Sequence, residues 1–214
     1  MTRSALLAAL ALVACGTEAP GPAPPTPSGG VAEAPAPPPD TFSITTDTHV
    51  LAKRPAAPLR VEGACPFEGC VYGTWTTSDV TTVYTRSADS TSAAFTVPAG
   101  TALEAPGGFV LVTRVGVSVA AQPTELFFSF EESAPLAAGD TVLVLDYEGE
   151  GSYRVWHGGR VGFSGASGPD AAYRQVTAPE QEWWARVTVP DGRAGWLWMD
   201  RTPGVRGADA LGGP

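Results

Sequence analysis

Few side chains of this sequence could do covalent chemistry. Its 214 residues include three cysteines and two histidines, His49 and His157. Hydrolysis by a serine or cysteine nucleophile also needs a base and a group that orients the base. His49 falls in the first expected strand region and His157 beside an expected hairpin turn, where a solvated or backbone-bonded imidazole is the favoured interpretation. We therefore expect no catalytic residues and no enzyme activity.

The cysteines indicate an anchor and a disulfide rather than a nucleophile. Cys15 follows a basic start and a short apolar run, residues 5–13, which is the pattern of an export signal and is too short to span a bilayer. This assignment leaves Cys65 and Cys70 as an even pair, which predicts a disulfide in an exported chain. A zinc site would need more ligands than the sequence offers, so we expect no metal and no cofactor.

The residues Leu12-Val13-Ala14-Cys15 resemble the lipobox of bacterial lipoproteins, in which the cysteine becomes the lipidated first residue of the mature chain. The resemblance implies that residues 1–14 are a signal peptide and that lipid on Cys15 holds the protein to a membrane. The alternative is an ordinary cleaved signal with a chance cysteine. The residue after Cys15 is Gly16, whereas an aspartate at this position would resemble an inner-membrane retention signal. The expected location is therefore the cell envelope, at the outer membrane facing the periplasm if the host has two membranes.

Residues 182–199 predict a β-hairpin that carries the second candidate site. Two arms rich in tryptophan and β-branched residues flank Pro190-Asp191-Gly192-Arg193, and proline, aspartate and glycine in this order favour a tight turn. Alternation along the first arm places Ala185, Val187 and Val189 on the core face.

The opposite face of this hairpin would carry Trp184, Arg186 and Trp198. Indoles can stack on an apolar ligand and a guanidinium can bind a carboxylate, so these three residues are the predicted ligand-binding surface. The alternative is that Trp184 only covers a barrel or packs between two barrels.

The hairpin resembles the last hairpin of bacterial SH3-like domains, where a tryptophan, a basic residue and a valine precede an Asp-Gly turn and a Gly-Trp-aliphatic strand. Residues 97–101 and 136–141 carry similar Ala-Gly turns, which resemble the short strand and turn of the same family. The resemblance implies one or two small SH3-like β-barrels. Two tandem barrels and one larger barrel with a long insertion both remain open.

The composition of the chain favours an all-β fold, since the chain contains 25 Gly and 21 Pro and only 16% charged residues. The composition also changes along the chain and divides it into parts. Residues 15–40 are rich in Pro and Ala and predict a disordered tether behind the anchor. The remaining predicted parts are a first β domain at 41–133, a second SH3-like barrel at 134–202 and a tail at 203–214.

The negative charge of the chain restricts the classes of partner that it can bind. A formal net charge of −9 argues against nucleic acid. Residues 115–153 contain seven carboxylates and no Lys or Arg, and Asp146–Gly151 imitates the start of a calcium loop. His157 stands where such a loop has its final glutamate, so a solvated acidic turn is favoured over a calcium site.

These observations predict a lipid-anchored, non-enzymatic binding module of the cell envelope. Its membrane contact would be the N-terminal lipid, and the SH3-like resemblance implies peptidoglycan, through its cell-wall peptides, or an envelope protein as the partner. The alternative is a structural or assembly subunit of an envelope complex with no small ligand.

Overall fold

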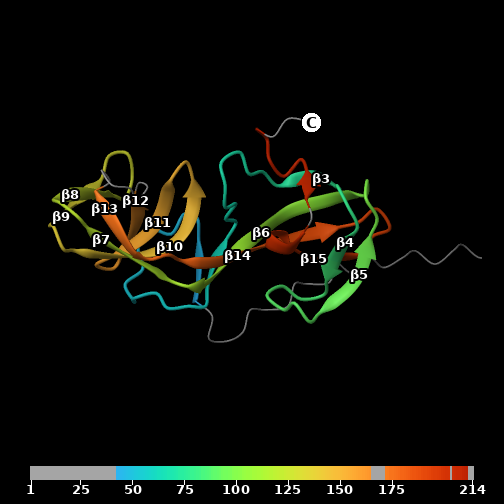
Figure 1. Ribbon diagram of the computed structural model, residues 1–214, viewed down its shortest axis with the longest axis horizontal. Helices are drawn as coiled ribbons and strands as arrows, with labels where there is room; N and C mark the ends of the chain where they lie inside the picture. The colour runs from blue at the N-terminus through green and yellow to red at the C-terminus, as the bar shows by residue number, and fades with distance from the viewer. Residues whose placement is uncertain (1–41, 165–171, 203, 212–214) are drawn as a thin grey trace, which may run out of the picture. The chain divides into compact units, whose positions relative to one another are not determined.

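Strands form nearly all of the regular structure in a computed structural model of the chain, which describes residues 42–164, 172–202 and 204–211. These residues form sixteen β-strands and one short 3-10 helix, η1 at Met199–Arg201, and they include no α-helix. The predicted all-β class is therefore confirmed. The strands are arranged in two sheets (Figure 1).

The predicted signal peptide at 1–14 and the tether at 15–40 lie outside the described residues, and so does Cys15.

The first sheet takes nine strands from both ends of the described chain. They are β1 (Phe42–Thr45), β2 (Leu59–Glu62), β3 (Gly73–Thr77), β4 (Thr81–Tyr84), β5 (Ala93–Val97), β6 (Ala102–Arg114), β14 (Glu180–Thr188), β15 (Ala194–Trp198) and β16 (Val205–Arg206). The main order is β1-β2-β6-β14-β15-β4-β5, and β3 pairs with both β6 and β16. The 13-residue strand β6 organises the sheet, because β2 and β3 pair along one of its edges and β14 along the other.

The second sheet consists of the seven strands that lie between β6 and β14 in the chain. They are β7 (Gly116–Ala120), β8 (Thr124–Phe127), β9 (Ser133–Leu136), β10 (Thr141–Gly149), β11 (Ser152–His157), β12 (Arg160–Ser164) and β13 (Tyr173–Thr177). Their order is β13-β7-β10-β11-β12-β8-β9, so β9 and β13 are its edge strands.

This pairing corrects the expected domain boundaries. The boundary between residues 133 and 134 falls within a hairpin, since Phe127 of β8 pairs with Ser133 of β9. The hairpin β14–β15 belongs to the first sheet, because β14 pairs with β6 along its length. The expected tail contributes β16, which pairs with β3. The second sheet is thus an insertion into the first, and the chain does not divide into two consecutive barrels.

The hairpin β14–β15 forms where the turn chemistry predicted it. Gly192 has a φ of +87° in the turn, a conformation that glycine adopts without strain. Its amide donates to the carbonyl of Val189 at 2.9 Å, and the amide of Val189 donates to the carbonyl of Arg193 at 2.9 Å. The resulting register places Trp184 opposite Trp198.

One apolar core lies against the first sheet and includes side chains from both sheets. Ala185, Val187 and Val189 are buried in it, as the alternation along β14 predicted. Leu145 of β10 and Val161 of β12 belong to the same cluster. A smaller cluster, built around other side chains of the second sheet, includes Leu126, Val142 and Val155, so this sheet buries apolar side chains on both of its faces.

Candidate functional site

The predicted ligand surface at Trp184, Arg186 and Trp198 is a packed aromatic layer. The indoles of Trp184 and Trp198 stack with ring centroids 5.4 Å apart and an interplanar angle of 12°. The ring of Tyr84 meets Trp184 edge-on at 5.6 Å. Trp184 is 0% exposed, and its Nε1 donates to Glu182 at 2.9 Å.

This burial corrects the predicted role of Trp184. Neighbouring strands bring Phe109, Leu111 and Trp196 to the same face, so the two faces of the first sheet both carry a buried layer. A ligand cannot reach Trp184 in this structure, and the interpretation of Trp184 as a packing residue replaces that of a ligand contact. Arg186 lies in register between Gly107 and Trp196 on this face.

Trp198, the third residue of the predicted surface, is partly exposed, and the guanidinium of Arg201 lies 5.3 Å from its ring centroid. Its Nε1 is buried and has no hydrogen-bond partner among the described residues.

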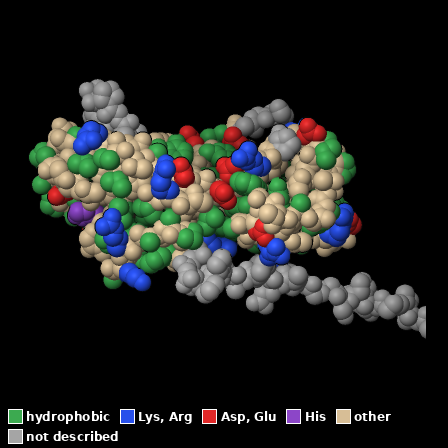
Figure 2. Space-filling view, turned by 60° about the horizontal axis from the view of Figure 1, so that its bottom comes forward, with side chains coloured by type: hydrophobic (Ala, Val, Ile, Leu, Met, Phe, Trp, Pro, Cys, Tyr) green, Lys and Arg blue, Asp and Glu red, His purple; other side chains and the backbone are tan. Residues whose placement is uncertain are grey.

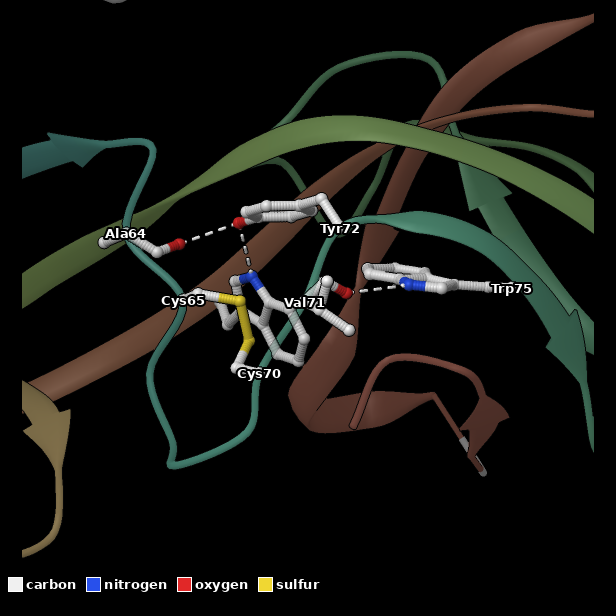
Figure 3. Close-up of a disulfide and its surroundings, with 7 residues drawn as sticks. Ala64, Cys65, Cys70, Val71, Tyr72 and Trp75 are labelled. Atoms are coloured by element: carbon white, nitrogen blue, oxygen red, sulfur yellow. Dashed lines mark hydrogen bonds between the residues drawn. A yellow bond between two sulfur atoms is a disulfide. The ribbon is translucent and has the colours of Figure 1, made fainter. Parts of the chain in front are cut away.

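The predicted disulfide between Cys65 and Cys70 is confirmed. Figure 3 shows it beside the hydroxyl of Tyr72, which donates to the carbonyl of Ala64 at 2.7 Å. The same hydroxyl accepts a hydrogen bond from the indole of Trp183 at 3.0 Å. Burial raises the pKa of Tyr72 to about 12, so the phenol stays protonated and keeps both bonds. The disulfide thus holds a short loop against the core.

The acidic run Asp146–Gly151 is only partly the expected solvated turn: Glu150 is exposed in the turn between β10 and β11, whereas Asp146 is buried and Glu148 is mostly buried. The guanidinium of Arg154 is paired with both Asp146, at 3.2 Å, and Glu148. The side chains of Arg154 and Asp146 are only 4% and 1% exposed. Burial raises the pKa of Asp146 to about 7, with a smaller contribution from the charge of Glu148, and burial also raises the pKa of Glu148; the guanidinium of Arg154 opposes both shifts. A cavity of about 200 Å³ adjoins these three residues.

A larger open cavity of about 720 Å³ lies on the second sheet, and we call it the phenylalanine cavity. Its apolar lining is four phenylalanines: Phe127, Phe128, Phe130 and Phe163. Its polar lining is His49, Ser129, Glu148 and Ser152. Among the described residues, Phe127 and Phe130 are the only exposed aromatic side chains. Glu148 also lines the smaller cavity, so the two cavities share one carboxylate.

The turn between β8 and β9 holds Phe130 outward. The amide of Phe128 donates to the carbonyl of Glu132 at 2.8 Å, and the hydroxyl of Ser129 accepts two backbone amides of the turn at 3.2 and 3.1 Å. Arg160 of β12 binds both carboxylate oxygens of Glu132, at 2.6 and 2.7 Å. Its guanidinium also lies 3.7 Å from the centroid of the Phe128 ring. The exposure of Phe130 therefore follows from a well-bonded turn.

Strand β12 also positions the other wall of the cavity. The amide of Val161 donates to the carbonyl of His49 at 3.0 Å, which fixes the loop after β1 beside β12. Strand β11 occupies the opposite edge of β12, so β8 pairs along the same edge as this loop, through Phe163 and Phe127. Gly162 permits this close approach, because a Cβ there would lie 2.3 Å from the carbonyl oxygen of Phe127.

The phenylalanine cavity was not predicted from the sequence, although the sequence contains a run of residues that could have indicated it. Phe127-Phe128-Ser129-Phe130 places three large apolar side chains at the end of a strand, where turns usually carry polar residues. The expectation for the histidines is confirmed at His157, whose Nδ1 lies 3.0 Å from the carbonyl oxygen of Thr141. His49 is exposed at the cavity, which agrees with the solvated alternative of the same expectation.

No protein-family model, curated protein or solved structure matches the chain. The described part of the chain contains no cluster of three His, Cys, Asp or Glu side chains that could hold a metal ion. No helix within residues 42–164, 172–202 and 204–211 has the length and apolar character needed to cross a membrane.

Proposed function

We propose that this protein is a lipid-anchored, non-enzymatic binding module of the cell envelope and that it binds its ligand in the phenylalanine cavity. The observation that carries the proposal is the pair of exposed phenylalanines at an open cavity of about 720 Å³. Ligand sites typically have volumes of about 300–1,000 Å³ and combine apolar walls with a few polar groups. The four phenylalanines and the polar lining of this cavity fit that description.

The surface context supports this choice. Figure 2 shows hydrophobic side chains in several patches on one face, with acidic and basic groups at their margins. Apolar surface alone therefore does not identify the ligand site of this protein. Exposed aromatic rings do set the phenylalanine cavity apart from the other apolar patches, because the described tryptophans and tyrosines are buried or partly buried. Large exposed aromatics beside a cavity commonly mark binding sites.

The ligand class follows from the resemblance of the β14–β15 hairpin to bacterial SH3-like domains, which suggests cell-wall peptides or an envelope protein. The disulfide supports an oxidising destination. The lipobox-like residues before Cys15 supply the anchor in this proposal.

A structural or assembly subunit with no small ligand is the second candidate. Phe130 is fully exposed, and β9, which follows its turn, is an edge strand of the second sheet. Edge strands present unpaired backbone groups that a partner protein can extend. In that case the two phenylalanines would anchor a protein partner of fixed stoichiometry.

Retention on purified peptidoglycan tests the proposal. We expect the wild type to be retained and the double variant Phe127→Ser/Phe130→Ser to be released, with an almost unchanged melting temperature because both side chains are exposed. Val80→Ser is the matched control, since Val80 is an exposed apolar residue that does not line the cavity. Equal retention of the wild type and the double variant would remove the cavity from the proposal. A stoichiometric protein partner that only the double variant loses would favour the assembly subunit.

The anchor has its own test in Cys15→Ala. Loss of lipid labelling and release into the soluble fraction are expected, and unchanged partition into detergent would contradict the anchor.

A further inference from the structure

We propose that the phenylalanine cavity selects an organic cation, in which an apolar body lies against the phenylalanines and an ammonium or guanidinium group meets Glu148. This inference rests on the proposed function, because it takes the cavity as the ligand site and adds the chemistry of the ligand.

The ionised side chains near the cavity carry more negative than positive charge. Two guanidinium groups, those of Arg154 and Arg160, face three carboxylates, those of Asp146, Glu148 and Glu132. Arg160 satisfies Glu132 through two hydrogen bonds. Asp146 and Glu148 must share Arg154, so this pair has one negative charge in excess when both are ionised. A ligand cation would compensate that charge.

Glu148 is open to the cavity. Its Oε1 accepts from Arg154, and no hydrogen bond to its Oε2 occurs among the described residues. The side chain is 21% exposed, whereas that of Asp146 is 1% exposed. Glu148 is therefore the carboxylate that a ligand in the phenylalanine cavity can reach. His49 is the other titratable group among the described lining residues.

A cation that lies on a phenylalanine ring and pairs with a carboxylate occurs at three places in the described structure. Three guanidinium groups lie on a phenylalanine ring while they pair with a carboxylate, at centroid distances of 3.5, 3.7 and 4.0 Å. The three sets are Arg60 with Phe109 and Glu62, Arg160 with Phe128 and Glu132, and Arg193 with Phe95 and Asp191. The negative face of an aromatic ring attracts cations, and a neighbouring carboxylate strengthens the site.

The phenylalanine cavity offers a carboxylate and aromatic rings, but its described lining includes no Lys or Arg side chain that lies on the exposed rings. The carboxylate is that of Glu148, and the rings of Phe127 and Phe130 are exposed beside it. A neutral apolar ligand would use the rings alone and leave the excess charge in place. A cationic ligand uses both components, which is the physical basis of the selectivity.

Tryptamine and tryptophol test the inference, because they share ring and chain and differ in an ammonium against a hydroxyl group. Titration of the purified protein is followed by ¹H–¹⁵N NMR at the amides of Glu148, Ser152 and Phe163. At pH 8, above the raised pKa of Asp146, we expect tryptamine to bind about fivefold tighter than tryptophol, as one partly exposed charge-assisted contact would give. Glu148→Gln should make the two affinities equal, while the amide oxygen can still accept from Arg154.

Glu131→Gln is the matched control, because Glu131 is exposed on the turn after Phe130 but does not line the cavity. The preference for tryptamine should persist in this variant. Equal affinities in the wild type, or a preference that survives Glu148→Gln, would overturn the inference and leave the proposed function intact. If neither compound shifts these amides and the double variant Phe127→Ser/Phe130→Ser retains peptidoglycan binding, the cavity fails as a ligand site and both proposals fall.

Discussion

Truncation of Trp184 to alanine should destabilise the protein strongly. The side chain is 0% exposed, and removal of such a buried indole costs about 3–5 kcal/mol through lost burial and a residual cavity. The variant also loses the stacked contact with Trp198 and the edge contact with Tyr84, and such pairs are worth about 0.5–1.5 kcal/mol beyond burial. The hydrogen bond to Glu182 adds little, because water can replace the indole at this half-buried carboxylate. We expect a loss of about 4 kcal/mol in the free energy of unfolding.

Urea unfolding followed by circular dichroism measures this loss, with Trp198→Ala as the control. Trp198 is partly exposed, so its truncation should cost about half as much. Neither variant should change ligand binding at the phenylalanine cavity. A loss below about 1 kcal/mol for Trp184→Ala would show that the indole is not packed as described, and the interpretation of Trp184 as a ligand contact would return.

Three further predictions concern other parts of the structure. Replacement of Cys65 and Cys70 by serine should lower the free energy of unfolding by about 2 kcal/mol, from the entropy of a short closed loop; equal stability of wild type and variant without reductant would contradict this. Between pH 4 and 7 the folded state should keep a proton on Asp146 that the unfolded state releases, so the stability of the wild type relative to Asp146→Asn should fall as pH rises. A relative stability that rises with pH would mean that Arg154 lowers this pKa. Gly162→Ala should cost about 2 kcal/mol or more, since its Cβ would meet a backbone oxygen at 2.3 Å, whereas Gly107→Ala, which faces open space, should be nearly neutral; equal effects would refute the close approach of β8 and β12.

Features set by neighbouring residues could be predicted from the sequence. The turn at Pro190–Arg193 specifies the hairpin β14–β15, and alternation then decides which side chains enter the core. The disulfide joins residues five positions apart, so it needs no knowledge of the fold. The all-β class follows from composition in the same way.

Features set by distant pairing could not be predicted. The partner of β14 is β6, and the whole second sheet lies between them in the chain. Nothing local in either strand specifies that partner, so the expected boundary at residue 133 was wrong. The burial of Trp184 has the same cause, because Tyr84 of β4 packs edge-on against its indole and Phe109 of β6 lies beside it in the same layer. Alternation places Trp184 opposite the core, but it does not say whether that side is also covered.

The phenylalanine cavity also depends on distant segments. Its described lining comes from the loop after β1, the end of β8 and the turn that follows it, and strands β10 to β12. The exposed phenylalanines are visible in the sequence, but the carboxylate of Glu148 reaches them only through the order of the second sheet. The pair of Asp146 and Arg154 is local, because the hairpin of β10 and β11 places these residues opposite each other, but its burial depends on the segments packed around it.

The most direct test of the central claim, that the phenylalanine cavity is the ligand site, is a map of amide shifts during the tryptamine titration. The account predicts shifts that cluster at Ser129, Phe130, Glu148 and Ser152 and that disappear in Phe127→Ser/Phe130→Ser. Shifts that cluster at Trp198 instead, or that persist unchanged in the double variant, would contradict it.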